Sequence, residues 1–195
     1  MLTAKELALT GPDIRTADSE LLEGLKAGSL PAFERLYETH GGRMKSVAMN
    51  LLGSAADAED AVQEAFLKVY RSAGGFRGGS SVSTWIYRIL VNTCYDLMRR
   101  GRRRPESPLP AEIALAPSAS SDHSTRLAIE VALRRLDPKE RAAFLLCEVE
   151  GFTHREAGEI LDVKENTSRT LLFRAKRRLQ RELSASGAFL PPEPA

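Results

Sequence analysis

Apolar residues recur every three or four positions through most of the chain, which is the spacing of one face of an α-helix. In the segment 56–71 the apolar positions form one stripe and the charged positions form another. Apolar residues also recur at helical spacing in 33–52, 85–98, 127–136 and 142–149. The pattern therefore predicts an all-α fold.

A segment rich in proline and serine divides this pattern in two. Between residues 105 and 122 the chain carries Pro105, Pro108, Pro110, Pro117, Ser118, Ser120 and Ser121. Such a composition is typical of an extended linker. We therefore expect two small helical domains, 18–104 and 124–183, joined by a flexible linker, 105–123. A loose N-terminal leader, 1–17, and a disordered tail, 184–195, complete the predicted organisation. A tether of this kind would let each domain hold its own site.

The second domain contains a candidate helix-turn-helix. Thr153 precedes Glu156 by three residues, which suits a capping box, and Ile160 and Leu161 continue an apolar face. The interruption at 162–164 is followed by a second helix that carries many basic residues. They are Arg169, Arg174, Lys176, Arg177, Arg178 and Arg181. Two helices joined by a short turn place the second helix in the DNA major groove. The alternative is a solvated amphipathic surface helix.

Charge is segregated along the chain although the net charge is only +2. Acidic residues gather at 56–64, whereas basic residues gather at 99–104 and 169–181. This separation indicates two partners of opposite charge. The acidic helix is either a well-made solvent face or a docking surface for a protein partner. Its paired carboxylates do not suggest acid–base catalysis, because no nucleophile or cleft signal accompanies them.

A Gly- and Ser-rich loop, 74–84, precedes a helix that has an aromatic, amide and guanidinium side. No Gly-Lys-Ser/Thr ends the loop and no strand precedes it, so it is not a phosphate-binding P-loop. Polar loops beside aromatic and arginine side chains suit a single strand of nucleic acid. Trp85 could equally be a core residue.

Several other classes of protein are not supported. No apolar run approaches the ~20 residues of a membrane span, and no secretory signal opens the chain. Cys94 and Cys147 are expected to be buried free thiols in a reducing, cytoplasmic compartment. The three histidines show no metal-ligand spacing, and no catalytic triad or nucleotide motif is present. We therefore expect no metal, no cofactor and no enzyme activity.

Taken together, the segments resemble the extracytoplasmic-function (group 4) sigma factors of bacterial RNA polymerase, within the sigma-70 family. The similarity covers residues 19–104 and 124–183. DAEDAVQEAFLKVYR (57–71) resembles the segment that docks on the β′ clamp helices. FRGGSSVSTWIYRILVNTCYDLMRR (76–100) resembles the promoter-melting and minus-ten segment. LDPKERAAFLLCEVEGFTHREAGEILDVKENTSRTLLFRAKRRL (136–179) resembles the minus-thirty-five domain.

This resemblance implies a role for particular residues. The polymerase-binding residues would be Asp57, Asp60, Gln63, Glu64 and Lys68. The minus-ten residues would be Phe76, Arg77, Ser80, Ser81, Thr84, Trp85, Arg88, Asn92, Arg99 and Arg100. The minus-thirty-five residues would be Arg155, Lys164, Asn166, Thr167, Arg169, Thr170, Arg174 and Arg177. The implied partners are core RNA polymerase, through its β′ clamp helices and β flap, promoter DNA and an anti-sigma factor, without direct membrane insertion.

The last domain departs from the family pattern at Gly158, Asp162, Ser168 and Leu171. Asp162 stands where glycine is common, so we expect a left-handed turn there. Ser168 replaces an apolar residue and is expected to weaken helix packing. A stand-alone helix-turn-helix regulator is the alternative function, although it would have no need of an acidic polymerase dock.

Overall fold

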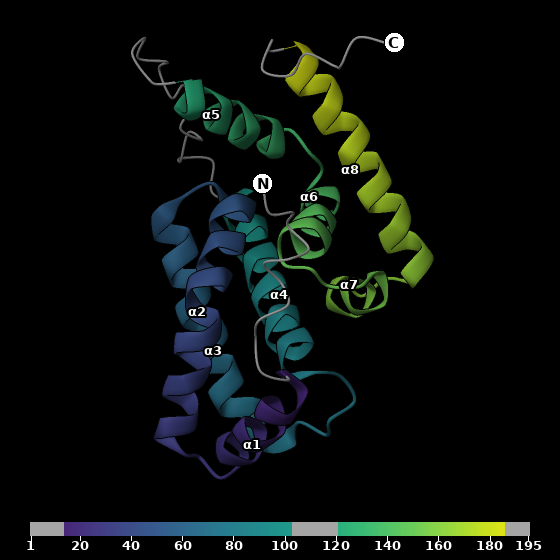
Figure 1. Ribbon diagram of the computed structural model, residues 1–195. Helices are drawn as coiled ribbons and strands as arrows, with labels where there is room; N and C mark the ends of the chain where they lie inside the picture. The colour runs from purple at the N-terminus through teal and green to yellow at the C-terminus, as the bar shows by residue number, and fades with distance from the viewer. Residues whose placement is uncertain (1–13, 103–120, 186–195) are drawn as a thin grey trace.

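The structure is a computed structural model that describes residues 14–102 and 121–185, all of them in helices and short turns (Figure 1). The first part of the chain forms α1 (Ile14–Lys26), α2 (Leu30–Leu52), α3 (Ala55–Ser72), a 3-10 turn (Ala73–Gly75) and α4 (Val82–Arg102). The second part forms α5 (Ser121–Arg134), α6 (Pro138–Phe144), a π-helical turn (Leu145–Val149), α7 (His154–Leu161) and α8 (Glu165–Ala185). The predicted all-α class is confirmed.

The first bundle is held together by α2, α3 and α4, whose apolar stripes face one another. Ser29 caps α2, Pro31 occupies its first turn, and Gly53 ends it with φ 75°. The helix continues without interruption through Gly41 and Gly42. The apolar stripe predicted in 56–71 is buried on α3 and consists of Ala58, Ala61, Val62, Ala65, Phe66 and Val69. The long helices therefore provide a rigid base for the surfaces described below.

The second bundle contains one feature that helical periodicity did not predict. Asp137 caps α6, but the helix changes to a π-turn at Leu145 before Gly151 ends it with φ 79°. A π-turn inserts one extra residue and so rotates everything that follows it. Here it precedes Glu150, a residue that contacts the first bundle.

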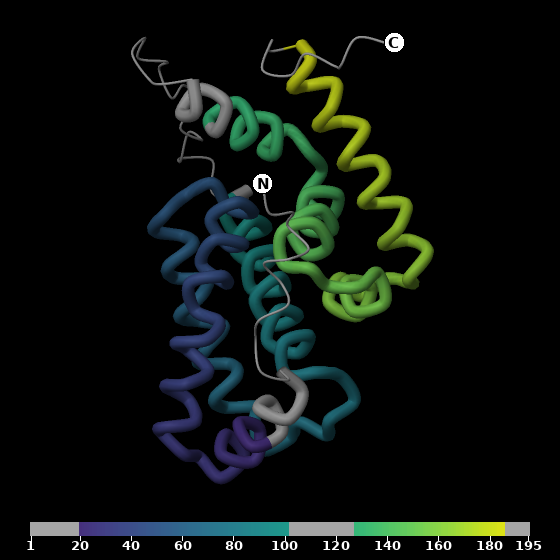
Figure 2. Tube along the Cα trace, in the orientation of Figure 1, coloured from purple at the N-terminus to yellow at the C-terminus, as the bar shows by residue number. Residues whose placement is uncertain are grey.

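The two bundles pack against each other, as the tube in Figure 2 shows for α4 beside α7. A single hydrophobic cluster includes Leu51 and Leu90 from the first bundle and Leu145 and Ile160 from the second. A smaller cluster joins α5 to α8. The two domains that the linker was expected to join therefore lie in contact in this structure. The reason is that α4 presents buried side chains to two sets of neighbours.

Some predicted boundaries were wrong. Helix α1 already begins at Ile14, so residues 14–17 are not a loose leader, because no glycine or proline interrupts them. Helix α5 begins at Ser121, inside the predicted linker, and α8 continues to Ala185, beyond the predicted start of the tail. The expectations for 1–13, 103–120 and 186–195 lie outside the described residues. None of the described helices is both long and apolar enough to cross a membrane.

Candidate nucleic-acid interface

The acidic face of α3 is accessible over most of its length. Ser54 caps the helix by accepting a hydrogen bond from the backbone N–H of Asp57. Asp57, Asp60 and Gln63 are exposed, and Glu64 is half-buried. Lys68 behaves differently from these residues. Its Nζ lies 2.9 Å from Glu64 Oε1 and 3.0 Å from Thr93 Oγ1 on α4, so it ties two helices together.

Two apolar residues on α3 were missed by the sequence analysis. Leu67 is 48% exposed and Tyr70 is 50% exposed. Tyr70 packs edge-to-face against Phe33 of α2, with ring centroids 5.6 Å apart. Both residues lie off the buried stripe of α3, and this position in the sequence could have predicted that they are exposed. Leu67 is thus an apolar side chain exposed on the same helix as the carboxylates.

The loop between α3 and α4 is anchored at both ends. Phe76 stacks on Trp85, with ring centroids 4.7 Å apart and an interplanar angle of 29°. Ser81 Oγ accepts a hydrogen bond from the backbone N–H of Thr84 and lies 2.8 Å from Thr84 Oγ1. Thr84 is fully buried, so in this structure it anchors the loop to α4 and offers no surface to DNA. Its place in the first turn of α4, facing the bundle, explains the difference from expectation.

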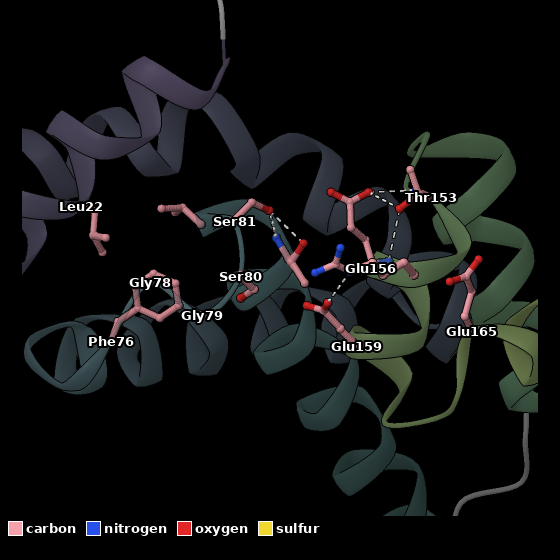
Figure 3. A pocket seen from close by; sticks show the side chains of 13 residues that line it. Leu22, Phe76, Gly78, Gly79, Ser80, Ser81, Thr153, Glu156, Glu159 and Glu165 are labelled. Carbon is pink, nitrogen blue, oxygen red and sulfur yellow. Dashed lines mark hydrogen bonds and ion pairs between the residues drawn. The ribbon is translucent and has the colours of Figure 1, made fainter.

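A pocket of about 720 Å³ lies between this loop and the start of α7 (Figure 3). The loop contributes Phe76, Ser80 and Ser81 to one side. The opposite side carries the carboxylates of Glu156, Glu159 and Glu165. Four of the ten predicted minus-ten residues, namely Phe76, Ser80, Ser81 and Thr84, therefore line a pocket whose opposite side carries acidic groups of the second bundle together with Arg155.

Of the remaining minus-ten residues, Arg77 lies in the loop and the others lie along α4. Arg88 Nε donates to the backbone oxygen of Glu159 at 2.8 Å, and its Nη2 lies 3.8 Å from Glu159 Oε2. Arg99 pairs with Asp96 one turn earlier. The other predicted residues are exposed: Arg77, Asn92 and Arg100. Arg88 is thus joined to the second bundle, whereas Arg77, Arg99 and Arg100 form no such contact within the described part of the chain.

The helix-turn-helix has the predicted local structure. Thr153 and Glu156 form the capping box, with the Thr153 backbone N–H donating to Glu156 Oε2 at 2.9 Å. Asp162 ends α7 in the left-handed region, with φ 53°. A Cβ on Gly158 would lie only 2.8 Å from the backbone oxygen of Val163. The turn therefore approaches α7 more closely than any side chain at residue 158 would allow.

All the predicted minus-thirty-five residues are exposed on α7, the turn or α8. They are Arg155, Lys164, Asn166, Thr167, Arg169, Thr170, Arg174 and Arg177. Arg169 forms an ion pair with Glu165 at 2.6 Å, and Arg155 lies 3.5 Å from Glu159. Phe173, which the sequence analysis missed, is 61% exposed and lies beneath the Arg177 guanidinium.

A polar cluster lies inside the helix-turn-helix. Ser168 is fully buried, and its Oγ lies 3.4 Å from His154 Nδ1, which is 3.7 Å from Cys147 Sγ. The hydroxyl that the sequence analysis regarded as a packing defect thus has a polar neighbour. Burial raises the pKa of the Cys147 thiol, and it raises that of Cys94 to about 12. Both thiols are therefore held in the neutral form, although Cys147 is only half-buried and so differs from the expected buried thiol. Among the described residues, no three His, Cys, Asp or Glu side chains gather as a metal site would require.

Comparison with known proteins agrees with this arrangement. The family model described as sigma-70 region 2 matches residues 36–104, and that described as sigma-70, region 4 matches residues 126–179. The chain is 35% identical over 167 residues to the ECF RNA polymerase sigma factor SigM of Mycobacterium tuberculosis, covering 86% of this chain and 85% of that protein. It is 32% identical over 173 residues to the ECF RNA polymerase sigma-E factor of Escherichia coli K12, covering 82% and 90%.

Solved structures show the same fold. CnrH, in complex with the cytosolic domain of CnrY, has a TM-score of 0.69 at 22% identity, covering 87% of this chain and 98% of that one. RpoE of Bartonella quintana, in complex with the anti-sigma factor NepR, has a TM-score of 0.64 at 26% identity, covering 78% and 96%. The two matched regions, the relatives and the exposed helix-turn-helix all lead to the same assignment. The chain belongs to the ECF sigma factors of RNA polymerase, which are transcription initiation factors rather than enzymes.

Proposed function

We propose that this sigma factor uses three separate surfaces, one for core RNA polymerase and two for promoter DNA. The exposed acidic face of α3 docks on the β′ clamp helices of core RNA polymerase. The loop 76–84 and α4 hold the opened minus-ten element, and α7 and α8 read the duplex at minus-thirty-five. The observation that carries this proposal is that one chain exposes an acidic helix face and, separately, a basic helix-turn-helix.

The polymerase dock combines charge with apolar contact. Asp57 and Asp60 form no ion pair within the described part of the chain, so their charges are available to a partner. Leu67, exposed on the same helix, adds an apolar anchor. Carboxylates steer a basic partner into place, and a central apolar residue contributes most of the affinity. We assign Lys68 to positioning α3 against α4, since its ammonium group is already bonded.

The minus-ten surface must offset the cost of opening DNA. Each base-pair step costs about 1.4 kcal/mol to separate, whereas a base stacked on an aromatic side chain recovers about 1–3 kcal/mol. The Phe76–Trp85 stack and the serine hydroxyls around the pocket suit capture of one unpaired base. Arg77, Asn92 and Arg100 would follow the backbone nearby.

The minus-thirty-five surface fits duplex DNA. The exposed polar residues at the start of α8, Asn166, Thr167 and Thr170, are placed where a recognition helix meets base edges. Lys164, Arg169 and Arg174 are suited to phosphates on either side. The two matched domains, with boundaries near residues 104 and 124, would then act at different parts of one promoter.

The remaining assignments follow from this role. We infer a cytoplasmic location, because core polymerase and promoter DNA are there, and we assign the chain no catalytic step of its own. Since the RpoE structure contains an anti-sigma factor, we also infer such a regulator for this chain. The β flap of polymerase is the expected second contact for the α5–α8 domain.

Transcription from purified components tests the function. Core polymerase with this chain should initiate on a subset of a random promoter library that core polymerase alone does not use. Reversing two charges on α3, with Asp60→Lys and Glu64→Lys, should abolish co-elution with core polymerase without loss of helical circular dichroism. The matched control reverses two exposed charges on α2, with Glu34→Lys and Glu38→Lys, and should still co-elute.

Two results would reject the proposal. If the α3 variant co-elutes as well as the control, the acidic face is an ordinary solvent surface. If the unaltered chain binds DNA specifically but never associates with polymerase, it is a stand-alone regulator. Loss of helical signal in the α3 variant would instead assign Asp60 and Glu64 a structural role.

A further inference from the structure

The buried stripe of α8 begins with a polar residue. Within the described chain, the buried positions of this helix are Ser168, Leu172, Ala175 and Leu179, spaced four, three and four residues apart. Ser168 is fully buried, yet its neighbours in the sequence are exposed candidates for reading DNA. An apolar side chain in this place would need no partner, whereas a buried hydroxyl is costly unless it forms a hydrogen bond. The serine is therefore explained by its partner and not by packing alone.

The partner of Ser168 is the imidazole of His154. Ser168 Oγ lies 3.4 Å from His154 Nδ1, across the interface between α8 and α7. Cys147 Sγ, from the π-turn, lies 3.7 Å from the same nitrogen. A hydroxyl and a neutral thiol can each donate or accept a hydrogen bond, so the contact can form with either tautomer of the ring. Three segments of the second bundle therefore meet at one polar contact.

His154 is itself held in place. It is the first residue of α7 and follows Thr153, whose backbone N–H and hydroxyl are both bonded to Glu156 in the capping box. At the other end of α7, a Cβ on Gly158 would lie 2.8 Å from Val163 O, so the turn leaves little space for one helix to slide along the other. The remaining freedom is rotation of α8 about its own axis. A hydrogen bond to the fixed imidazole opposes this rotation because such bonds are directional.

A small rotation of α8 would change how it meets DNA. Side chains extend about 5–6 Å from a helix axis, so a rotation of ~20° moves their ends by about 2 Å. Asn166, Thr167 and Thr170 have short side chains, and a displacement of this size exceeds the tolerance of a hydrogen bond to a base edge. Lys164 and Arg174 have long, rotatable stems and can still reach a phosphate. A rotated helix would therefore lose sequence discrimination before it lost affinity for the DNA backbone.

We propose that Ser168 is a positioning residue for minus-thirty-five recognition, and that its hydrogen bond to His154 fixes the rotation of α8. This inference rests on the proposed function, because it assigns α8 to duplex DNA. The bond determines how well the chain distinguishes one sequence from another. It contributes little to the net stability of the fold, because the hydroxyl exchanges a bond to water for a bond to the ring.

Competition between two templates in one reaction measures this discrimination. The holoenzyme is assembled from core polymerase and the full chain. One template is a promoter recovered from the random library, and the other is identical except that its minus-thirty-five bases are permuted. The ratio of the two transcripts reports discrimination and is unaffected by a loss of active protein. We expect Ser168→Ala to lower this ratio at least about fivefold, the smallest effect expected for the loss of one base contact. Its urea midpoint should stay within about 0.5 M of that of the unaltered chain.

Matched variants separate the hydrogen bond from other effects. Ser168→Thr keeps the hydroxyl and should keep the transcript ratio within about twofold. Ser184→Ala makes the same chemical change at an exposed position of α8 and should also leave the ratio unchanged. His154→Phe removes the ring nitrogen and should reproduce the effect of Ser168→Ala, whereas His154→Asn places an amide near the position of Nδ1 and should restore most of the ratio. The double variant of Ser168→Ala with His154→Phe should lose no more than either single variant.

The proposal is overturned if Ser168→Ala keeps the ratio of the unaltered chain, even when total transcription falls, because the hydroxyl would then only stabilise the fold. Losses that multiply in the double variant would also overturn it, since the two residues would act independently. So would equal losses in Ser168→Ala, Ser168→Thr and His154→Asn, because shape and not the hydrogen bond would be responsible. Should Ser168→Ala not fold, His154→Phe and His154→Asn provide the same comparison. Failure of the unaltered chain to initiate, or to distinguish the two templates, would instead overturn the proposed function.

Discussion

Arg141 offers a direct test of how strongly the two bundles are coupled. Its side chain is buried and forms no ion pair with a carboxylate among the described residues, although Asp137 lies near enough to oppose part of the effect of burial on its pKa. The guanidinium donates to Leu51 O at 2.8 Å and Asn50 O at 3.4 Å, at the C-terminus of α2. It also donates within its own bundle, to Arg134 O at 2.6 Å and Leu136 O at 3.2 Å. The carbonyls at the end of a helix carry partial negative charge, which explains how a lone cation is accommodated there.

The expected effect of Arg141→Met can be calculated from these contacts. Three of the four bonds are 3.2 Å or shorter, and a bond to a charged group contributes about 1.5–3 kcal/mol. Burial of the guanidinium opposes this by several kcal/mol, and burial is the main cause that lowers the pKa of Arg141. Nε adds nothing, because it has no partner among the described residues. Methionine keeps most of the apolar stem, so we expect a net loss of about 3 kcal/mol.

Urea denaturation followed by tryptophan fluorescence and by circular dichroism measures this loss of stability and shows which bundle it affects. Trp85 is the only tryptophan of the chain and lies on α4, so its fluorescence reports the first bundle, whereas far-ultraviolet circular dichroism reports all helices. With a slope of about 2 kcal/mol per molar urea, the midpoint should fall by about 1.5 M in both signals. Lys139→Met, which alters an exposed residue of the same helix, should leave both midpoints within about 0.3 M. If Arg141→Met moves the circular dichroism midpoint but not that of Trp85, the bundles are not coupled and the reasoning fails.

Three further predictions test other parts of the structure. Asp162→Gly should raise the free energy of unfolding by about 0.5–1 kcal/mol, because glycine adopts the left-handed conformation without strain. Gly158→Ala should lower it by about 1 kcal/mol, because the added Cβ would meet a backbone oxygen. Urea midpoints measure both changes, and a shift of the two midpoints in the same direction would contradict the turn geometry. Arg169→Ala should reduce the slope of log affinity for duplex DNA against log salt by about one, and an unchanged slope in a fluorescence titration would exclude a phosphate contact. Burial, with the nearby Arg43 as a second cause, lowers the pKa of His40, so the folded state binds fewer protons there than the unfolded state. Stability should therefore fall as the pH drops below about 6.5, and His40→Gln should reduce this loss between pH 7.5 and 5.5, as measured by thermal unfolding.

The sequence predicted features that depend on neighbouring residues. The capping box required only Thr153 and Glu156, three positions apart, and the left-handed turn required only that a short polar residue follow the apolar face of α7. The stripe on α3 was likewise a matter of local spacing. These features are confirmed because hydrogen bonds and burial within one or two turns determine them.

The features that the sequence did not predict depend on distant partners. Tyr87 and Glu150 are 63 residues apart, and Arg141 and Asn50 are 91 apart. In the sequence, each of these residues is an ordinary polar position on an amphipathic helix. The π-turn at Leu145 has no periodic signal of its own, since it changes the register by a single residue. Tertiary packing therefore decided which polar residues became exposed DNA-binding candidates and which became internal partners.

This distinction bears on the order of events at a promoter. If both DNA-binding surfaces were free, a flexible tether would let either one bind first. In the structure, Arg88 is engaged by Glu159 whereas Lys164 and Arg174 are exposed, so under the proposed function Arg88 has to leave Glu159 before it can contact DNA. Contact with closed DNA would then come before capture of an unpaired base, which is the order that melting requires, because the base is not available until the duplex has opened.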